Sequence, residues 1–301
     1  MKKKNDLTSF MEKFGTEEKC FKHLCELKWG AGFTCLKCAH TVGTKGHTWH
    51  HRRCKKCGYD ESCTAHTLFH KLKFPVVNAF VIVYQLSTMK KGMSTHEIAR
   101  QHGIHQETAW FFKRKVQRAM QESKQPLLSG MVQVDEAVIG GFEKGATGRS
   151  RGKRQRIQMA VEIDLSKDGR GSVQIKNASA RVIDNYSSDA LAEAMDKMID
   201  PKAIIISDEW TSYPKAVKGR THFAEPSNKG ENMPQIHRLI FNLKNWIRGI
   251  HHHVSPEHLQ SYLDEFFFRF SKRNQLNSIS KNLLHAMVLH QWFPYKSAIA
   301  A

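Results

Sequence analysis

Acidic residues are scarce in this chain of 301 residues, where 28 Asp and Glu stand against 47 Lys and Arg and leave a formal net charge of +19. Such an excess of positive charge favours a polyanionic partner, because neutralising phosphates releases their counterions. The chain also lacks any apolar run near the 18 or so residues that a membrane span needs. Its first residues, Met1–Lys4, lead into Asn5 and Asp6 rather than an apolar stretch, so no secretory signal is expected.

The chain has seven cysteines, an odd number that does not fit a disulfide scaffold. We therefore expect a reducing, cytoplasmic (nucleoid-associated) compartment. Four of the seven form two CxxC pairs, Cys35 with Cys38 and Cys54 with Cys57. This spacing is typical of a four-thiolate zinc site, since two thiolates on each tight turn complete a tetrahedron around one ion. Residues 20–70 are therefore predicted to form a zinc ribbon that binds structural Zn²⁺.

The other three cysteines, Cys20, Cys25 and Cys63, flank these pairs. Buried small apolar side chains are the favoured interpretation, because free cysteine usually behaves in this way. A second zinc site that uses Cys20, Cys25 and His23 is the weaker alternative.

Residues 71–125 are predicted to be helical and to contain a helix-turn-helix. Ser94 is an N-cap with Glu97 three residues later, Gly103 makes a turn, and a second helix runs over 108–120. The second helix carries four basic residues expected to contact DNA phosphates: Lys113, Arg114, Lys115 and Arg118. The alternative is an ordinary helical hairpin with a solvated basic face.

An α/β pattern follows a short linker at 126–130. Strands are predicted at 131–134, 157–163, 171–177 and 203–206, with helices at 184–198, 236–250 and 256–274. A hairpin turn is expected at 167–170 and a loop rich in Gly, Arg and Lys at 144–156. Four cations of this loop are further candidates for phosphate contact: Arg149, Arg151, Lys153 and Arg154.

Two aspartates, Asp135 and Asp208, each come at the end of an apolar strand. Ligands of open α/β sheets bind at the carboxyl ends of the strands, so these carboxylates are placed for one site. Paired carboxylates are how two-metal nucleases hold Mg²⁺. Glu136 follows Asp135 directly and should point to the opposite face of its strand, out of the site or behind it.

A late helix supplies two more candidates, His237 and Lys244, which are seven residues apart and so share one helix face. A metal ligand in the first turn and a cation two turns later would place metal chemistry and a phosphate contact on one side. The run His251–His253 is interpreted as a loop near DNA rather than a metal site, since zinc ligands need a wider spread.

Together these motifs resemble insertion-sequence transposases with an N-terminal zinc ribbon and a ribonuclease-H-like DDE catalytic domain, the ISXO2-like group. The resemblance covers roughly residues 18–275. It is carried by the two CxxC pairs and by four later stretches: 134–141, Ser207–Tyr213, 242–252 and 262–270. It implies a multidomain α/β protein with a zinc ribbon, a helix-turn-helix segment and a mixed-sheet catalytic domain. The expected boundaries are 1–19 for a lead, 20–70, 71–125, 130–275, and 276–301 for a C-terminal tail.

The resemblance also implies the roles of the site residues. Asp135, Asp208 and His237 would bind two Mg²⁺ or Mn²⁺ ions, and Lys244 would contact DNA, with Arg248 as a further DNA contact. His237 departs from the usual Glu, and Mg²⁺ prefers oxygen ligands. Glu231, Asn232 and Glu265 stay open as alternative ligands, and a disabled copy is the other possibility.

The activity implied is DNA transposition: binding the terminal inverted repeats, then metal-dependent strand cleavage and strand transfer on double-stranded DNA, by a homodimer or larger assembly. Two alternatives stay open. A DNA-binding regulator would use the aspartates only as turn caps, and a nuclease of the same fold would cut without joining.

Overall fold

The computed structural model describes residues 6–123, 126–141, 154–167, 173–226, 228, 231–251 and 254–300. The chain divides into two compact units. Unit 1 combines Met1–Ser123 with Asn274–Ala301, and unit 2 is Lys124–Arg273. None of the described helices has both the length and the apolar character that crossing a bilayer requires.

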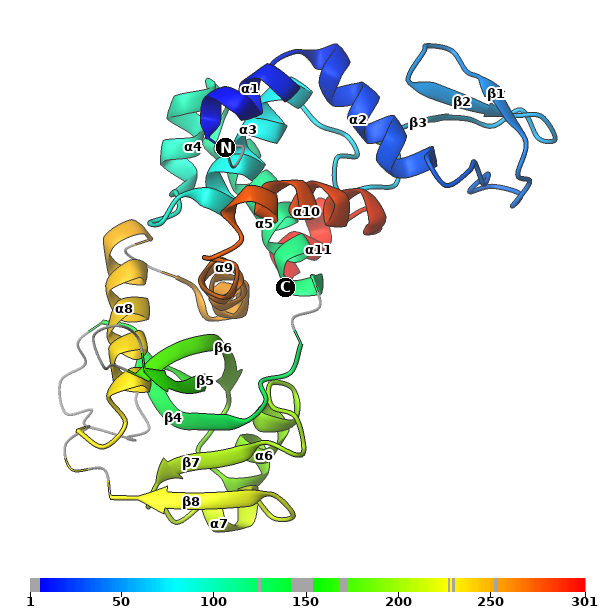
Figure 1. Ribbon diagram of the computed structural model, residues 1–301. Helices are drawn as coiled ribbons and strands as arrows, with labels where there is room; N and C mark the ends of the chain where they lie inside the picture. Colours follow the sequence, from blue (N-terminus) through cyan, green and yellow to red (C-terminus); the bar gives the residue numbers. More distant parts are fainter. Residues whose placement is uncertain are drawn as a thin grey trace. The chain divides into compact units, whose positions relative to one another are not determined.

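Unit 1 consists of a small antiparallel sheet and a group of helices (Figure 1). The sheet has the order β1-β2-β3, with the strands Gly43–Lys45, His51–Cys54 and Asp60–Ser62. The helices are α1 (Leu7–Phe14), α2 (Glu17–Trp29), α3 (Val76–Thr88), α4 (Thr95–His102), α5 (Gln106–Glu122), α10 (Leu276–Leu289) and α11 (Tyr295–Ala300).

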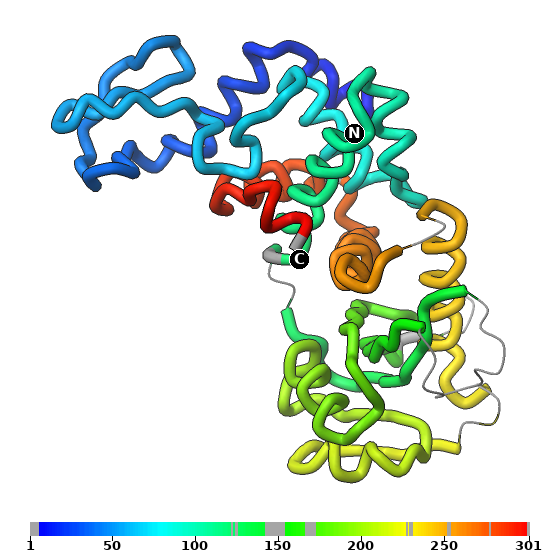
Figure 2. Tube along the Cα trace, turned by 180° about the vertical axis from the view of Figure 1, so that it is seen from behind, coloured from blue at the N-terminus to red at the C-terminus, as the bar shows by residue number. Residues whose placement is uncertain are grey.

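An aromatic core joins these helices. The ring of Phe80 on α3 lies 5.2 Å from Phe14 and 5.8 Å from Phe69, and Phe69 lies 6.4 Å from Phe112 on α5. Residues 276–301, expected as a tail, instead contribute α10 and α11, and Leu283, Leu284 and Met287 of α10 are buried. Figure 2 shows this C-terminal segment in red.

Two helices joined by a short turn, α4 and α5, lie where the sequence predicted a helix-turn-helix. The Ser94 side chain accepts a hydrogen bond from the Glu97 N–H, and Gly103 adopts φ 62°, a conformation that glycine reaches without a Cβ penalty. These features fix where α4 begins and ends.

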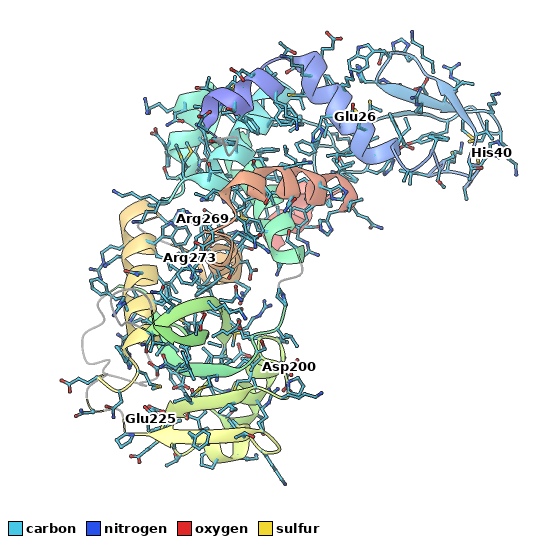
Figure 3. All side chains as sticks on the ribbon, in the orientation of Figure 1. Glu26, His40, Asp200, Glu225, Arg269 and Arg273 are labelled. Atoms are coloured by element: carbon cyan, nitrogen blue, oxygen red, sulfur yellow. The ribbon has the colours of Figure 1, made fainter. Side chains whose placement is uncertain are left out.

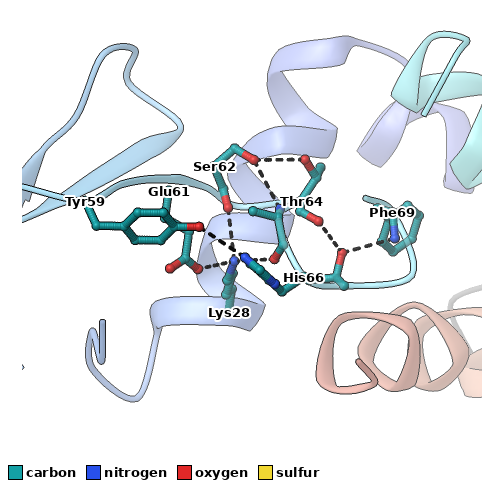
Figure 4. Close-up of polar contacts among 9 residues, drawn as sticks. Lys28, Tyr59, Glu61, Ser62, Thr64, His66 and Phe69 are labelled. Carbon is teal, nitrogen blue, oxygen red and sulfur yellow. Dashed lines mark hydrogen bonds and ion pairs between the residues drawn. The ribbon is translucent and has the colours of Figure 1, made fainter. Parts of the chain in front are cut away.

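A buried lysine fastens the three-stranded sheet to α2. The ammonium group of Lys28 donates hydrogen bonds to the carbonyls of Ser62 and Ala65, at 3.0 and 2.7 Å, and pairs with the carboxylate of Glu61 (Figure 4). Glu61 is 1% exposed. Removing either partner would leave a buried charge uncompensated, so this pair holds the sheet in place on α2.

Unit 2 is a five-stranded mixed sheet with helices on both faces. The strands are β4 (Met131–Ile139), β5 (Gln155–Lys167), β6 (Val173–Ile183), β7 (Ile204–Asp208) and β8 (Thr221–Glu225), in the order β6-β5-β4-β7-β8. β4, β5 and β6 are antiparallel neighbours, whereas β7 runs parallel to β4 and β8 parallel to β7. This is the ribonuclease-H-like mixed sheet that the sequence predicted.

The two faces of the sheet bury separate cores. One core packs against α8 (Pro234–Ile250) and α9 (Leu259–Ser271), which follows the 3-10 turn Pro256–His258. The other packs against α6 (Ser188–Asp196) and α7 (Tyr213–Ala216). The side chain of Ser187 caps α6 by accepting a hydrogen bond from the N–H of Ala190.

Two arginines fasten α9 to its neighbours (Figure 3). The Arg269 guanidinium lies 5.1 Å from the centre of the Trp246 ring on α8, and it pairs with Glu265 at 3.5 Å. Arg273, just beyond α9, donates hydrogen bonds to the carbonyls of Ile175 and Lys176 on β6. Both contacts fix α8 and α9 on the same face of the sheet.

Candidate active site and metal centres

The two aspartates lie at matching positions on neighbouring parallel strands. Gln133 of β4 pairs with Ile206 of β7, and two residues further along each strand come Asp135 and Asp208. Because side chains alternate along a strand, the core memberships show which face each residue occupies. Ala137 and Ile206 belong to the core under α8, so Asp135 and Asp208 face α8 together.

Glu136 faces the other way, as predicted. Its carboxylate accepts a hydrogen bond of 2.5 Å from the hydroxyl of Tyr213, which is fully buried in the core on the α6 and α7 side. Burial first, and then the nearby Glu136 carboxylate, raise the pKa of Tyr213 well above its usual value. The tyrosine therefore stays protonated and supports the strand end from behind.

Backbone amides also orient both aspartates. Asp135 accepts a hydrogen bond from the N–H of Glu136 at 2.8 Å, and Asp208 accepts one from the N–H of Trp210 at 3.2 Å. Both side chains are thus suited to hold a cation.

His237 reaches this pair from the first turn of α8. Its Nδ1 lies 3.5 Å from the Asp135 carboxylate, and its buried Nε2 has no hydrogen-bond partner among the described residues. Burial lowers the pKa of His237 more than the nearby Asp208 raises it, so the imidazole is neutral at pH 7 and the contact is not an ion pair. A neutral imidazole with an unused nitrogen is a competent metal ligand.

Lys244 lies two turns further along α8 and is half buried. Burial lowers the pKa of Lys244, the Asp135 carboxylate raises it, and Arg154 and Arg248 lower it. Lys244 therefore lies within electrostatic range of Asp135, Arg154 and Arg248. A Cβ on Gly140 would meet Arg154 Cγ at 3.1 Å, and φ at Gly140 is 143°, so glycine lets that arginine lie against the end of β4. These cations form a positive surface beside the carboxylates.

A buried glutamine that sequence reasoning missed positions the start of α8. The side chain of Gln133 accepts a hydrogen bond from the N–H of Ile236 at 3.3 Å and donates one to Gln235 at 3.1 Å. The first amides of a helix have no partner within it, so Gln133 caps α8 from a neighbouring strand. The only sign of this role in the sequence is that Gln133 lies two residues before Asp135 and therefore shares its face of the strand.

Replacing Gln133 with alanine should destabilise unit 2 by about 1–3 kcal/mol, because the buried amide of Ile236 loses its acceptor. Gln235→Ala is the matched control, since it removes only the bond between the two side chains and should cost less than about 1 kcal/mol. Urea unfolding followed by tryptophan fluorescence measures both. Equal midpoints for the two variants would contradict the capping role.

The four thiols of the CxxC pairs converge in unit 1. Their sulfur atoms all lie within 4.8 Å of one another, with Cys35 to Cys57 and Cys38 to Cys54 both at 3.6 Å. Thiolates about 2.3 Å from one tetrahedral ion are about 3.8 Å apart, so the donor set and its spacing fit zinc. The module is zinc-ribbon-like, as predicted.

Within the described part of the chain, these thiols are the only group of three or more His, Cys, Asp and Glu side chains gathered closely enough to share one ion. Asp135, Asp208 and His237 are neighbours but are not gathered as tightly. Glu265, an alternative ligand, is fully buried and pairs with Arg269, while Glu231 and Asn232 bond within their own loop.

Cys20 and Cys63 are buried, which agrees with the favoured interpretation of small apolar side chains.

The basic residues predicted on α5 are mostly buried. The ammonium groups of Lys113 and Lys115 donate hydrogen bonds to the carbonyls of Met93 and His70, both at 2.8 Å. Arg114 is 4% exposed and donates to the Gln117 side chain. Those contacts leave the two lysines unavailable to a phosphate in this conformation, whereas Arg118 is exposed and stays a predicted DNA contact.

Of the other residues predicted to contact DNA, the structure describes two and leaves three outside the described residues. Arg248 is exposed on α8, and both Arg248 and Arg154 lie close enough to Lys244 to lower its pKa. Arg149, Arg151 and Lys153 lie outside the described residues, as do the turn at 168–170 and His252 and His253. His251 packs against Trp246 and Tyr262, with ring centres 4.8 and 4.5 Å away.

The strand order and the aspartates at the strand ends define unit 2 as a ribonuclease-H-like domain with a carboxylate site. Residues 127–271 match the sequence model of the ISXO2-like transposase domain. This part of the chain is thus similar to the transposase domain of that family.

Comparison with curated proteins finds no significant match. Among solved structures, the Mos1 strand transfer complex is similar at 12% identity and a TM-score of 0.30, covering 71% of this chain and 79% of that chain. The Mos1 mariner paired-end complex with Mn is similar at 11% identity and a TM-score of 0.31, covering 71% and 79%. At TM-scores this low the likeness carries no further conclusion.

Proposed function

We propose that the protein is a DNA transposase that binds the terminal inverted repeats of an insertion sequence and catalyses metal-dependent strand cleavage and strand transfer. The observation that carries the proposal is the placement of Asp135 and Asp208 on one face of two adjacent parallel strands, with His237 at 3.5 Å from Asp135. The family match of unit 2 supports the same activity.

Divalent cations, Mg²⁺ or Mn²⁺, would be held by Asp135, Asp208 and the neutral imidazole of His237. When bound, two such ions supply an activated water or 3′-hydroxyl and stabilise the leaving oxygen of a phosphodiester. The protein's own part is to hold the carboxylates in place through backbone amides and to keep Lys244, Arg154 and Arg248 beside the scissile phosphate. Their charge offsets the charge that builds up during the transfer.

Structural Zn²⁺, held by Cys35, Cys38, Cys54 and Cys57, would fold the ribbon. We propose that the ribbon and the α4–α5 pair bind the DNA ends, in keeping with the net charge of +19. Joining two ends to one target requires at least two active sites, so a dimer or larger assembly on DNA is part of the proposal.

Incubating the protein with a DNA fragment that carries the element's ends and with a target plasmid tests this function. Nicking at the ends with Mg²⁺ or Mn²⁺, followed by joined products, is the expected result. Nicking without joining would identify a nuclease of the same fold. Tight binding of the ends without nicking in either metal would leave a DNA-binding regulator.

The pH dependence should report on His237. Burial holds its pKa below 6.5, so its lone pair is lost, and cleavage declines, only as the pH falls below that value. In His237→Glu the acid limb of the rate should move to lower pH, because free carboxyl groups titrate near 4.3. The variant should also gain activity with Mg²⁺ relative to Mn²⁺. Superimposable pH profiles for the two proteins would remove His237 from the metal site.

A further inference from the structure

A cavity of about 370 Å³ lies within unit 1, away from the residues assigned above to metal or catalysis. Residues 70–74, the first half of α5, Trp292 and Tyr295 line it. The cavity is large enough for a small ligand, since pockets of a few hundred Å³ are typical of such sites. We call it the ring pocket.

Aromatic rings form much of its wall. Phe111 and Tyr295 meet edge to face with centres 5.2 Å apart, and Phe74 meets Phe112 in the same way at 5.2 Å. Trp292 is 39% exposed and Tyr295 47% exposed, which is a large apolar ring area left facing outward. Exposed aromatic side chains that line a cavity favour a ligand with a flat apolar surface.

Cations stand beside the rings. The ammonium of Lys71 lies 5.1 Å from the centre of the Trp292 ring, and Lys73 is exposed at the rim. Lys115 lies 4.7 Å from the Phe111 ring and is buried, so its positive charge acts in a partly dry setting. Glu107 supplies a carboxylate at the same wall. The ligand that matches this lining carries negative charge next to a flat ring.

We propose that the ring pocket binds one unpaired base of a DNA strand, with Lys71 and Lys73 at the phosphates on either side of it. Stacking on aromatic side chains tolerates every base, because each base has a π-face, and lysines that follow the backbone complete such sites. The pocket adjoins the first turns of α5, the second helix of the helix-turn-helix pair. That DNA is the source of the base rests on the proposed function.

Two short duplexes of arbitrary sequence test the proposal without any cleavage. Each contains one extra nucleotide in one strand, an adenine in the first and an abasic residue in the second, so that they differ only by the base. Fluorescence anisotropy without Mg²⁺ or Mn²⁺ gives the affinity of the full-length, zinc-loaded protein for each. The wild type should bind the adenine duplex at least about fivefold more tightly, as expected for one stacked base.

Tyr295→Ala should abolish this preference, and Tyr295→Phe, which keeps the ring, should retain it. Trp292→Ala is an independent second variant, and thermal unfolding of each variant shows that unit 1 is folded. Lys73→Ala should weaken both duplexes alike and reduce the salt dependence by about one phosphate contact. Lys22→Ala, an exposed lysine on α2, is its matched control.

Equal affinity of the wild type for the two duplexes would overturn the proposal, as would a preference that Tyr295→Ala leaves unchanged. A self-association that Tyr295→Ala disrupts, with no effect on the base preference, would show that a second copy of the chain occupies the pocket. None of these outcomes depends on strand cleavage, so a failure here is distinguishable from a failure of the transposase proposal.

Discussion

Asp208→Ala should lower the rate of DNA strand cleavage by about a thousandfold or more while end binding stays within about twofold of the wild type. The carboxylate lies on the α8 face beside Asp135, so its loss would remove one ligand of the proposed metal site. Metal ions stabilise developing charge by several kcal/mol, and each 1.36 kcal/mol is a factor of ten in rate, so about 4 kcal/mol gives about three decades.

The neighbouring acid offers a matched control. Glu209 is exposed and follows Asp208 directly, so Glu209→Ala removes the same charge from the same strand end without removing a residue of the α8 face. Cleavage by this variant should stay within a fewfold of the wild type. Gel analysis of nicked products at fixed enzyme and metal measures both variants. Undiminished cleavage by Asp208→Ala would exclude the proposed site.

Removing one thiolate of the CxxC pairs should unfold the ribbon and abolish DNA end binding. Structural zinc in small modules contributes about 10–16 kcal/mol of apparent binding free energy at pH 7, far more than three short strands supply alone. Cys54→Ala should therefore release zinc, measured as metal per chain. Unit 2, which has its own sheet and two cores, should keep its fold.

Cys25→Ala is the control for this experiment, because Cys25 lies outside the four-thiol cluster. It should retain zinc and bind the DNA ends as the wild type does. Circular dichroism and thiol titration distinguish a locally unfolded ribbon from a misfolded chain. Full zinc content in Cys54→Ala would show that this thiol is not a ligand.

The strands that carry the candidate site could be predicted because they are locally distinctive. The strand that ends at Asp208 is a short, mostly buried apolar run, and the strand of Asp135 alternates between two cores. β8 was missed because its residues Thr221–Glu225 are mostly exposed at the sheet edge and show no apolar run. Local pattern recognises a buried strand far more readily than an edge strand.

The burial of polar and charged side chains by distant parts of the chain could not be predicted from the sequence. The lysines of α5 were interpreted as a surface because charged side chains usually are, yet Lys113 and Lys115 reach carbonyls contributed by distant residues. The role of Gln133 was equally hidden, since it caps a helix that begins about a hundred residues later. The periodic apolar residues of α10, in contrast, are a signal that could have been used.

The division of the chain into a unit built from both ends and a unit built from the middle has a consequence for synthesis on the ribosome. Unit 2 is complete once residue 273 has emerged, whereas unit 1 still waits for Leu283, Leu284 and Met287, which fill its interior. Domains fold as their residues leave the exit tunnel. Unit 1 therefore cannot complete its interior until the segment after residue 273 is available, whereas unit 2 needs nothing beyond that residue.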